Sequence, residues 1–228
     1  SGFNALDTPG YIIGGASDDY TTVLIDGSDN IFAAGSRTAL FKDMLLVKYL
    51  ATGALDTSLN GTGELTVDVN PLANDSVEQL IFDSNHDLHW VGNVFVLAQQ
   101  QVAVVKTSPT GILDTSFSGN GKASFVLAPL LDDSRVTSAV IDSTNNIVVG
   151  FTDVLLGGKR HMIGRIKPDG NLDTTFDSNG YARVATCANT SQLESIVLLN
   201  NSAFIVAGQC YINGTLGNNI DISQYQLD

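Results

Sequence analysis

The stretch Gly111-Ile112-Leu113-Asp114-Thr115-Ser116-Phe117-Ser118-Gly119-Asn120-Gly121 decides the fold of this chain, because versions of it return along the whole length. Close copies occupy residues 53–63 and 170–180, and a shorter copy, Ala5-Leu6-Asp7-Thr8, stands near the start. Repetition at a regular spacing usually marks an architecture in which each unit buries its apolar face against its neighbours. The sequence therefore predicts a repeat protein.

The leucines of this repeated string divide the chain into four units within a single domain, 1–228. Each unit contains four short runs rich in β-branched and apolar residues, separated by turns of Asp, Asn, Ser and Gly. The middle two runs are continuously apolar, as in strands that are covered on both faces. This pattern predicts an all-β fold, a β-propeller of four blades with four antiparallel strands each, one blade per repeat. The units are approximately 6–54, 55–112, 113–171 and 172–228.

The string stands between the fourth run of one unit and the first run of the next. We therefore expect it to connect the outer strand of one blade to the inner strand of the following blade. Its Leu and Phe would fill the gap between blades, while its Asp and Thr would bond turn amides. Both ends of the chain lie at the same phase of the repeat, so a single ring would close without exchanging a strand. The alternative is that two chains pair to make a larger ring.

Residues 105–117 and Ile166-Lys167-Pro168-Asp169-Gly170-Asn171-Leu172-Asp173-Thr174-Thr175-Phe176 resemble the delta-60 repeat. This family of bacterial β-propeller repeats has as its signature an outer strand, a Gly turn, Leu-Asp-x-Ser/Thr-Phe and a pair of glycines. The resemblance covers all four units and is weakest after Leu6, where Pro9 intrudes and Gly10 replaces the Phe. It implies a propeller fold in a bacterial protein, and it carries no activity onto particular residues here.

Composition narrows the range of partners and compartments. Of the 228 residues, 24 are Asp or Glu and 11 are Lys or Arg, giving a formal charge of -13 that disfavours nucleic acid and anionic membrane surfaces. No apolar run approaches the roughly 20 residues that span a bilayer. The start lacks a charged region followed by an apolar stretch, so we expect either no secretory signal or one already removed. Scarce Lys with abundant Asn, Thr, Ser and Gly favours an extracytoplasmic protein, periplasmic or secreted.

Two cysteines occur, Cys187 and Cys210, both in the last unit. Cys187 follows the first predicted strand of that unit and Cys210 follows the third, so both should lie on the same side of one blade. They are either a disulfide or two reduced, buried thiols, and the sequence leaves both alternatives open.

One copy of the string has the spacing of a calcium loop. Asp173, Thr175, Asp177 and Asn179 present oxygen side chains at alternate positions, as calcium ligands do. The twelfth position of such a loop should be a bidentate Glu, whereas this chain has Val184 there. Turn chemistry explains the same residues without a metal. Calcium at this string is thus one hypothesis, and the sequence predicts no other cofactor.

A second candidate site lies in the turn of the second unit. His86 and His89 stand close to two aspartates, a combination that could hold zinc, and Trp90 could stack against a sugar ring or another aromatic ligand. The alternatives are an exposed polar turn and a tryptophan that fills the core. On a strand His89 and Trp90 face opposite sides, so their convergence on one ligand is not required by the sequence.

No catalytic motif is present, and nothing in the sequence nominates a nucleophile or a general base. The best interpretation is a non-catalytic binding or interaction module, a monomer or homodimer, whose partner is a protein or a carbohydrate. One alternative is a hydrolase or lyase with its site at the mouth of the central channel, which converging carboxylates or histidines would favour. Another is a structural segment that assembles with copies of itself.

Overall fold

Neighbouring β-strands pair through short polar turns in the computed structural model, which describes residues 14–96, 99–126, 135–155, 158–184, 190–200, 203–211 and 218–226. The strands are β1 (Asp18–Ile25), β2 (Ile31–Thr38), β3 (Lys42–Tyr49), β4 (Glu64–Val67), β5 (Asp75–Phe82), β6 (Leu88–Val96), β7 (Gln99–Thr107), β8 (Lys122–Phe125), β9 (Arg135–Ile141), β10 (Ile147–Leu155), β11 (Gly158–Ile166), β12 (Tyr181–Arg183), β13 (Thr190–Asn200), β14 (Ala203–Tyr211) and β15 (Asn218–Gln226). A short 3-10 helix, η1 (Phe176–Ser178), precedes β12. Among the described residues, no helix has the length and apolar character needed to cross a lipid bilayer.

The strands form four antiparallel sheets, which confirms the all-β class. Three sheets have four strands, in the orders β1-β2-β3-β4, β5-β6-β7-β8 and β9-β10-β11-β12. Within the described residues the last sheet has three, β13-β14-β15. The tight turns from β5 to β6 and from β9 to β10 follow the predicted chemistry. Asp83 and Asp142 each accept hydrogen bonds from the backbone amides two and four residues later.

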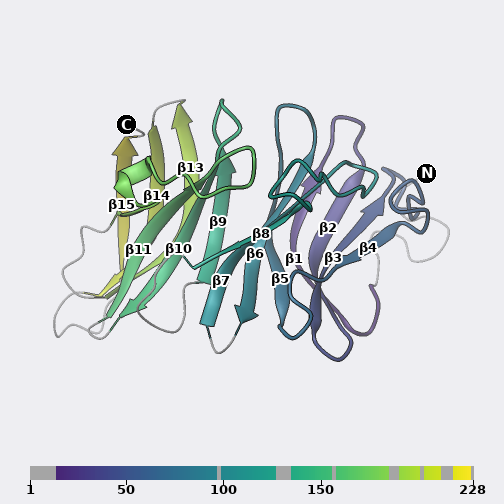
Figure 1. Cartoon of the computed structure of the whole chain (residues 1–228), viewed down its shortest axis with the longest axis horizontal. Coiled ribbons are helices and arrows are strands. Elements are labelled where there is room, and N and C mark those ends of the chain that lie inside the picture. The colour runs from purple at the N-terminus through teal and green to yellow at the C-terminus, as the bar shows by residue number, and fades with distance from the viewer. Residues whose placement is uncertain are drawn as a thin grey trace.

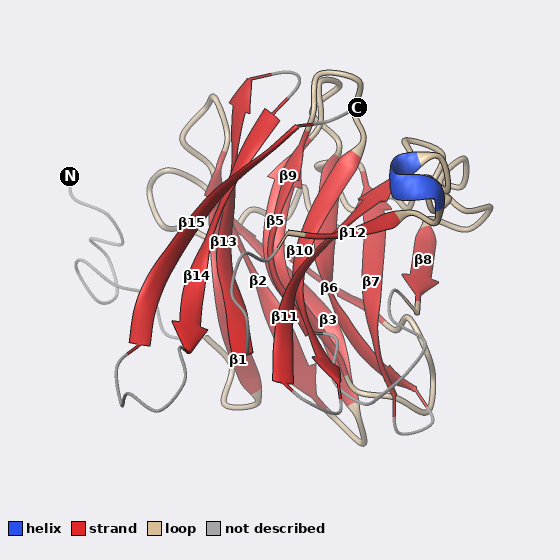
Figure 2. Cartoon of the chain, turned by 90° about the vertical axis from the view of Figure 1, so that its left-hand side faces the viewer, coloured by secondary structure: helices blue, strands red, loops and turns tan. Residues whose placement is uncertain are grey.

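The sheets stand in a row, with the first and the fourth at opposite ends of the long axis (Figure 1). β1 packs beside β5, β5 beside β9, and β9 beside β13. Figure 2 looks along this row from the sheet of β13–β15. One apolar cluster fills each of the three gaps between consecutive sheets, so the sheets pack face to face as predicted for the middle strands. The closed ring expected from the sequence is not shown by the described part of the chain.

The aromatic position of the repeated string docks each sheet onto the next, as expected, whereas the leading Leu is only partly buried and Leu55 is 41% exposed. Leu59, Phe117 and Phe176, which occupy equivalent positions in three copies, are at most 3% exposed and belong to the three successive apolar clusters. Two hydrogen bonds join a copy to the residue that precedes the next copy. The amide of Asn60 donates to the carbonyl of Thr110, and the amide of Ser118 donates to the carbonyl of Asp169.

The path of the chain after the string differs from the prediction. We expected the following run to open the next blade, but β4 pairs with β3, β8 with β7 and β12 with β11. The reason is local: Leu55 forms an antiparallel bridge back to Tyr49, and positive φ angles at Asn60, Gly61 and Gly63 then reverse the chain. Each of these sheets therefore spans the boundary between two sequence units, which corrects the assignment of one blade to one repeat.

Candidate functional site

A polar cleft of about 510 Å³ lies at the edge where the inner strands begin, which we call the strand-start edge. Several strand ends meet at this edge (Figure 1). The strands β1, β5 and β9 start there, β2 and β6 end there, and β3 and β7 start there again after a short connection. The cleft crosses the first three sheets. Its lining residues are Asp19, Tyr20, Thr21, Ser36, Lys42, Asn74, Asp75, Ser76, Glu78, Asn93, Phe95, Gln100 and Arg135.

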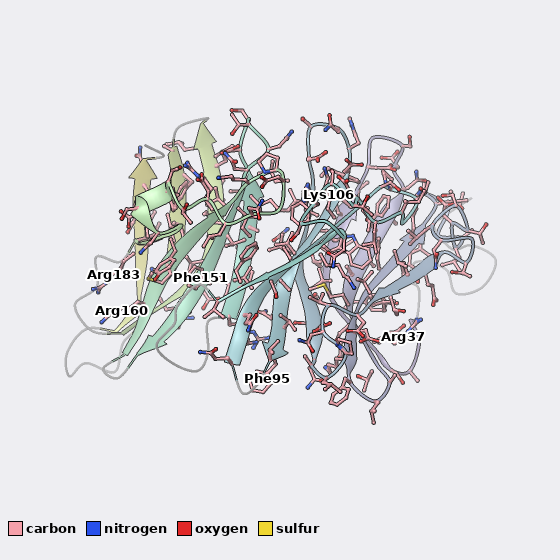
Figure 3. The ribbon with its side chains drawn as sticks, in the orientation of Figure 1. Arg37, Phe95, Lys106, Phe151, Arg160 and Arg183 are labelled. Carbon is pink, nitrogen blue, oxygen red and sulfur yellow. The ribbon has the colours of Figure 1, made fainter. Side chains whose placement is uncertain are left out.

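Two aromatic side chains of the cleft are exposed. Phe95 is 46% exposed and projects from the end of β6 at the strand-start edge (Figure 3). Tyr20 on β1 is 38% exposed, and its hydroxyl donates a hydrogen bond of 3.3 Å to Asp18 Oδ2. Partial burial, with Tyr49 and the carboxylate of Asp18 nearby, raises the pKa of the Tyr20 phenol well above its usual value, so the hydroxyl stays protonated.

Amide, carboxylate and guanidinium groups surround these rings. Glu78 Oε1 accepts hydrogen bonds from Ser76 Oγ at 3.2 Å and from Asn93 Nδ2 at 3.1 Å, and it lies 3.6 Å from the Arg135 guanidinium. Asn93 Oδ1 accepts the amide of Val136 at 2.9 Å, which fixes the amide group across the gap between the second and third sheets. The cleft thus presents donors and acceptors held in place by the fold.

Three carboxylates, one of which belongs to the cleft residue Asp75, converge between the first and second sheets. One oxygen from each of Asp43, Asp68 and Asp75 lies within 4.8 Å of the others. Burial raises the pKa of Asp75 to about 6, with a further contribution from the two neighbouring carboxylates, against hydrogen bonds from the amides of Val69 and Asn70. Burial and Asp68 also raise the pKa of Asp43.

The structure places the predicted histidine and tryptophan site away from this cleft. Trp90 is fully buried and donates from Nε1 to Thr107 Oγ1 at 3.1 Å, which is the core alternative. His89 is 1% exposed, and its Nε2 lies 3.3 Å from Asp83 Oδ2; burial lowers its pKa. His86 occupies the turn position with positive φ that Asn145 takes in the third sheet. These three residues present no shared surface to a ligand.

The proposed calcium string performs turn and ion-pair chemistry. Asp173 Oδ1 accepts from both the amide and the hydroxyl of Thr175, while its Oδ2 accepts from Arg165 Nε at 2.7 Å. Asn179 Oδ1 accepts the amide of Tyr181, and Asp177 has φ of 45°. The Arg165 guanidinium already neutralises the carboxylate that a metal would need, so this geometry favours the turn alternative; calcium binding itself stays a prediction.

The disulfide prediction lies outside the described residues, since Cys187 is not among them and the side chain of Cys210 is not described. The cleft residues were missed for a general reason. Tyr20 lies on β1, Glu78 on β5, and Asn93 and Phe95 on β6, and the four residues share no local motif. The only signal in the sequence was the position of each residue near the strand-start edge. The strand order brings these positions together in the fold.

Comparisons with known proteins find solved structures with a similar fold. No protein-family model matches the chain, so the resemblance to delta-60 repeats stays a prediction. No curated protein matches it either. A protein of unknown function from Dyadobacter fermentans DSM 18053 is similar in structure, with a TM-score of 0.52, 10% identity, and coverage of 97% of this chain and 80% of the other.

An ulvan lyase of polysaccharide lyase family PL25 is similar to the same degree. Its TM-score is 0.52 at 8% identity, and the match covers 90% of this chain and 52% of the lyase, so this chain spans about half of that protein. A structure of the lyase bound to -[GlcA(1-4)Rha3S]- gives the same values. At these identities the likeness shows the fold alone.

Proposed function

We propose that this protein is a binding module that takes a carbohydrate segment into the cleft at the strand-start edge. The observation that carries the proposal is the pairing of two exposed aromatic rings, Tyr20 and Phe95, with fixed amide and carboxylate groups in one concave surface. Sugar rings present apolar C–H faces and a rim of hydroxyls. Aromatic faces complement the former, and Asn, Gln and carboxylate oxygens complement the latter.

The charges in the cleft favour a neutral or weakly charged saccharide over a polyanion. Lys42 Nζ lies 2.7 Å from Asp19 Oδ2, and Arg135 faces Glu78, so each cation of the cleft has an acidic neighbour. The formal charge of -13 also repels polyanions at longer range. The similarity to a polysaccharide lyase supports a saccharide ligand at the level of the fold. From the sequence we also propose that the ligand could be a protein, that the location is extracytoplasmic and that the source is bacterial.

A lyase or hydrolase is the second candidate, because three carboxylates do converge beside the cleft. Hydrolysis of a glycosidic bond usually employs two carboxyl groups that flank the bond, about 5 to 9.5 Å apart. Here the oxygens are within 4.8 Å of one another, and Asp75 is fully buried. This arrangement suits the binding of a cation better than an attack on a sugar.

At the level of the fold, we propose that the four sheets are blades of a β-propeller. Since the run after each string completes the preceding sheet, the copy at Ala5-Leu6-Asp7-Thr8 with residues 11–13 corresponds to β4, β8 and β12 in sequence. β15 has no partner on its outer edge among the described strands. The first and fourth sheets lie at opposite ends of the row, so we propose that a strand from a second copy of the chain completes the fourth sheet.

Affinity electrophoresis in native gels cast with xylan, mixed-linkage β-glucan, galactan or ulvan tests the binding proposal. We expect at least one polysaccharide to retard the wild-type protein. Phe95→Ala should weaken that binding about tenfold, the loss expected from about 1.4 kcal/mol of stacking. Leu40→Ala is the matched control, because Leu40 is 88% exposed near the same edge without lining the cleft. Equal mobility of all three proteins in every gel would contradict the proposal.

A further inference from the structure

Three aspartates from different elements meet between the first and second sheets. Asp43 is the second residue of β3, Asp68 follows the last residue of β4, and Asp75 opens β5. The segment that crosses from β4 to β5 contains Asp68 and leads into Asp75. One carboxylate oxygen of each residue lies within 4.8 Å of the others, although the residues are up to 32 positions apart in sequence.

Two of these carboxylates have buried oxygens without a hydrogen-bond partner. Asp75 is 0% exposed; its Oδ2 accepts the amides of Val69 at 2.7 Å and Asn70 at 3.4 Å, whereas its Oδ1 has no donor. Asp68 Oδ1 is also buried and has no hydrogen-bond partner. A buried carboxylate oxygen that accepts nothing is costly, and two further acids beside the fully buried Asp75 add to that cost. Within the described residues, no Lys, Arg or His forms an ion pair with any of the three.

The repeat itself provides an internal comparison. Asp43 is paired to Arg37 as Gln101 is paired to Val94. The bulges that follow Val77 in β5 and Val136 in β9 align these two residues, so the place of Asp75 belongs in the sequence to Ser134. The residue that follows β8, in the place of Asp68, is Val126. The second boundary between sheets therefore has an amide, an apolar residue and a serine at the same three positions of the sequence. Three carboxylates are not a requirement of the scaffold.

We infer that Asp43, Asp68 and Asp75 bind a divalent cation, calcium by the chemistry of the donors, between the first and second sheets. All donors are hard oxygens, without His or Cys, which favours calcium over zinc and similar metals. Calcium–oxygen distances of about 2.3–2.6 Å place two ligands of one ion up to about 5 Å apart, which the separation here satisfies. The raised pKa values of Asp75 and Asp43 agree with a cluster of acids whose carboxylates form no ion pair among the described residues. Lys122 Nζ donates at 2.9 Å to the main-chain carbonyl of Asp68 and not to its carboxylate.

The cation would have a definite structural task. It would join β3 to the segment that crosses from β4 to β5, and so hold Asn74 and Asp75, both of which line the cleft. Asn74 already accepts the amide of Lys42 through its side-chain oxygen at 3.0 Å. The inference rests on the three carboxylates and does not depend on the proposed ligand of the cleft.

The test is the thermal midpoint of the full chain in chelator and in rising calcium chloride, with magnesium chloride as a comparison. A cation that binds only the folded state raises the midpoint, by roughly 5–10 °C at about a hundred times its Kd. Asp75→Asn should abolish that rise and leave the midpoint in chelator equal to or above that of the wild type, because it removes a buried charge. Asp43→Asn supplies the same comparison at a half-buried position if the first variant does not fold.

Asp177→Asn is the matched control, since Asp177 is exposed in the alternative calcium string. It should keep the full calcium shift. A wild-type midpoint that is the same in chelator and in millimolar calcium would overturn the inference. So would a shift that survives in both Asp75→Asn and Asp43→Asn, and a shift lost only in Asp177→Asn would transfer the site to the string.

Discussion

At the scale of single residues, the aspartate of each string makes two different interactions with its two oxygens. In Asp56, Asp114 and Asp173, Oδ1 accepts the amide two residues later, while Oδ2 lies 2.7–3.0 Å from a Lys or Arg on the third strand of the sheet. The cations are Lys48, Lys106 and Arg165. One side chain thus fixes the local turn and also ties it to the sheet, which explains why the Asp recurs with the Leu and the aromatic residue.

The pH dependence of Asp114 follows from these contacts. Hydrogen bonds from Ser116, and the Lys106 ammonium, lower the pKa of Asp114 from its usual 3.8 to about 2. A lowered pKa in the folded state means that this stabilisation is present above pH 3.8 and is lost as the pH falls towards 2. Asp114→Asn should therefore destabilise the protein at pH 7 by about 1 kcal/mol, a value reduced by solvent screening.

Urea unfolding of the wild type and Asp114→Asn across the pH range checks this prediction. The difference in free energy of unfolding should be constant near neutral pH and shrink as the pH falls from about 4 to about 2. A difference that stays the same down to pH 2 would show that the charge of Asp114 is not what stabilises the turn.

At the scale of elements, the string determines how neighbouring sheets dock. Phe117 is fully buried between the second and third sheets. Its ring makes a T-shaped contact with the His89 ring, and the two ring centroids are 5.8 Å apart. Lys48 lies over the Phe32 ring and Arg165 over the Phe176 ring, so the same cations that pair with the aspartates also cover apolar side chains. Loss of Phe117 should therefore weaken the contact between two sheets, and its effect should not be limited to one turn.

Phe117→Ala should lower the free energy of unfolding by about 3–5 kcal/mol, because it leaves a cavity in a close-packed cluster. Ile112→Ala is a suitable control, since Ile112 belongs to the same string and is 70% exposed. Chemical denaturation of both variants measures the effect. If Phe117→Ala were as stable as Ile112→Ala, the string would not be the element that docks the sheets.

The elements also show what the sequence could and could not predict. The strands, the tight Asp turns and the buried Leu or Phe of the string follow from local patterns. The pairing of β4 with β3 depends on the single bridge between Leu55 and Tyr49 and on where the chain reverses, which no periodicity records. The cleft and the three aspartates are assembled by strand order from distant positions, so they have no local signature.

At the scale of the whole molecule, β15 has no partner on its outer edge among the described strands, and the sequence holds one further copy of the string near its start. If a strand from a second chain completes the fourth sheet, light scattering should give twice the 24.1 kDa of one chain. Deleting residues 1–13 should then return the protein to the mass of a monomer. A full-length monomer whose melting temperature falls on this deletion would instead indicate closure within one chain, and a monomer unaffected by it would contradict both arrangements.

The central claim is that the strand-start edge is the face that binds ligand. Amide chemical-shift mapping, with oligosaccharides cut from the polysaccharide that retards the protein most, tests it directly. We expect the changes to be confined to the cleft, at Asn74, Asn93, Phe95 and Gln100, and to disappear in Phe95→Ala. Changes at the opposite edge, among the turns of the repeated string, would contradict the claim.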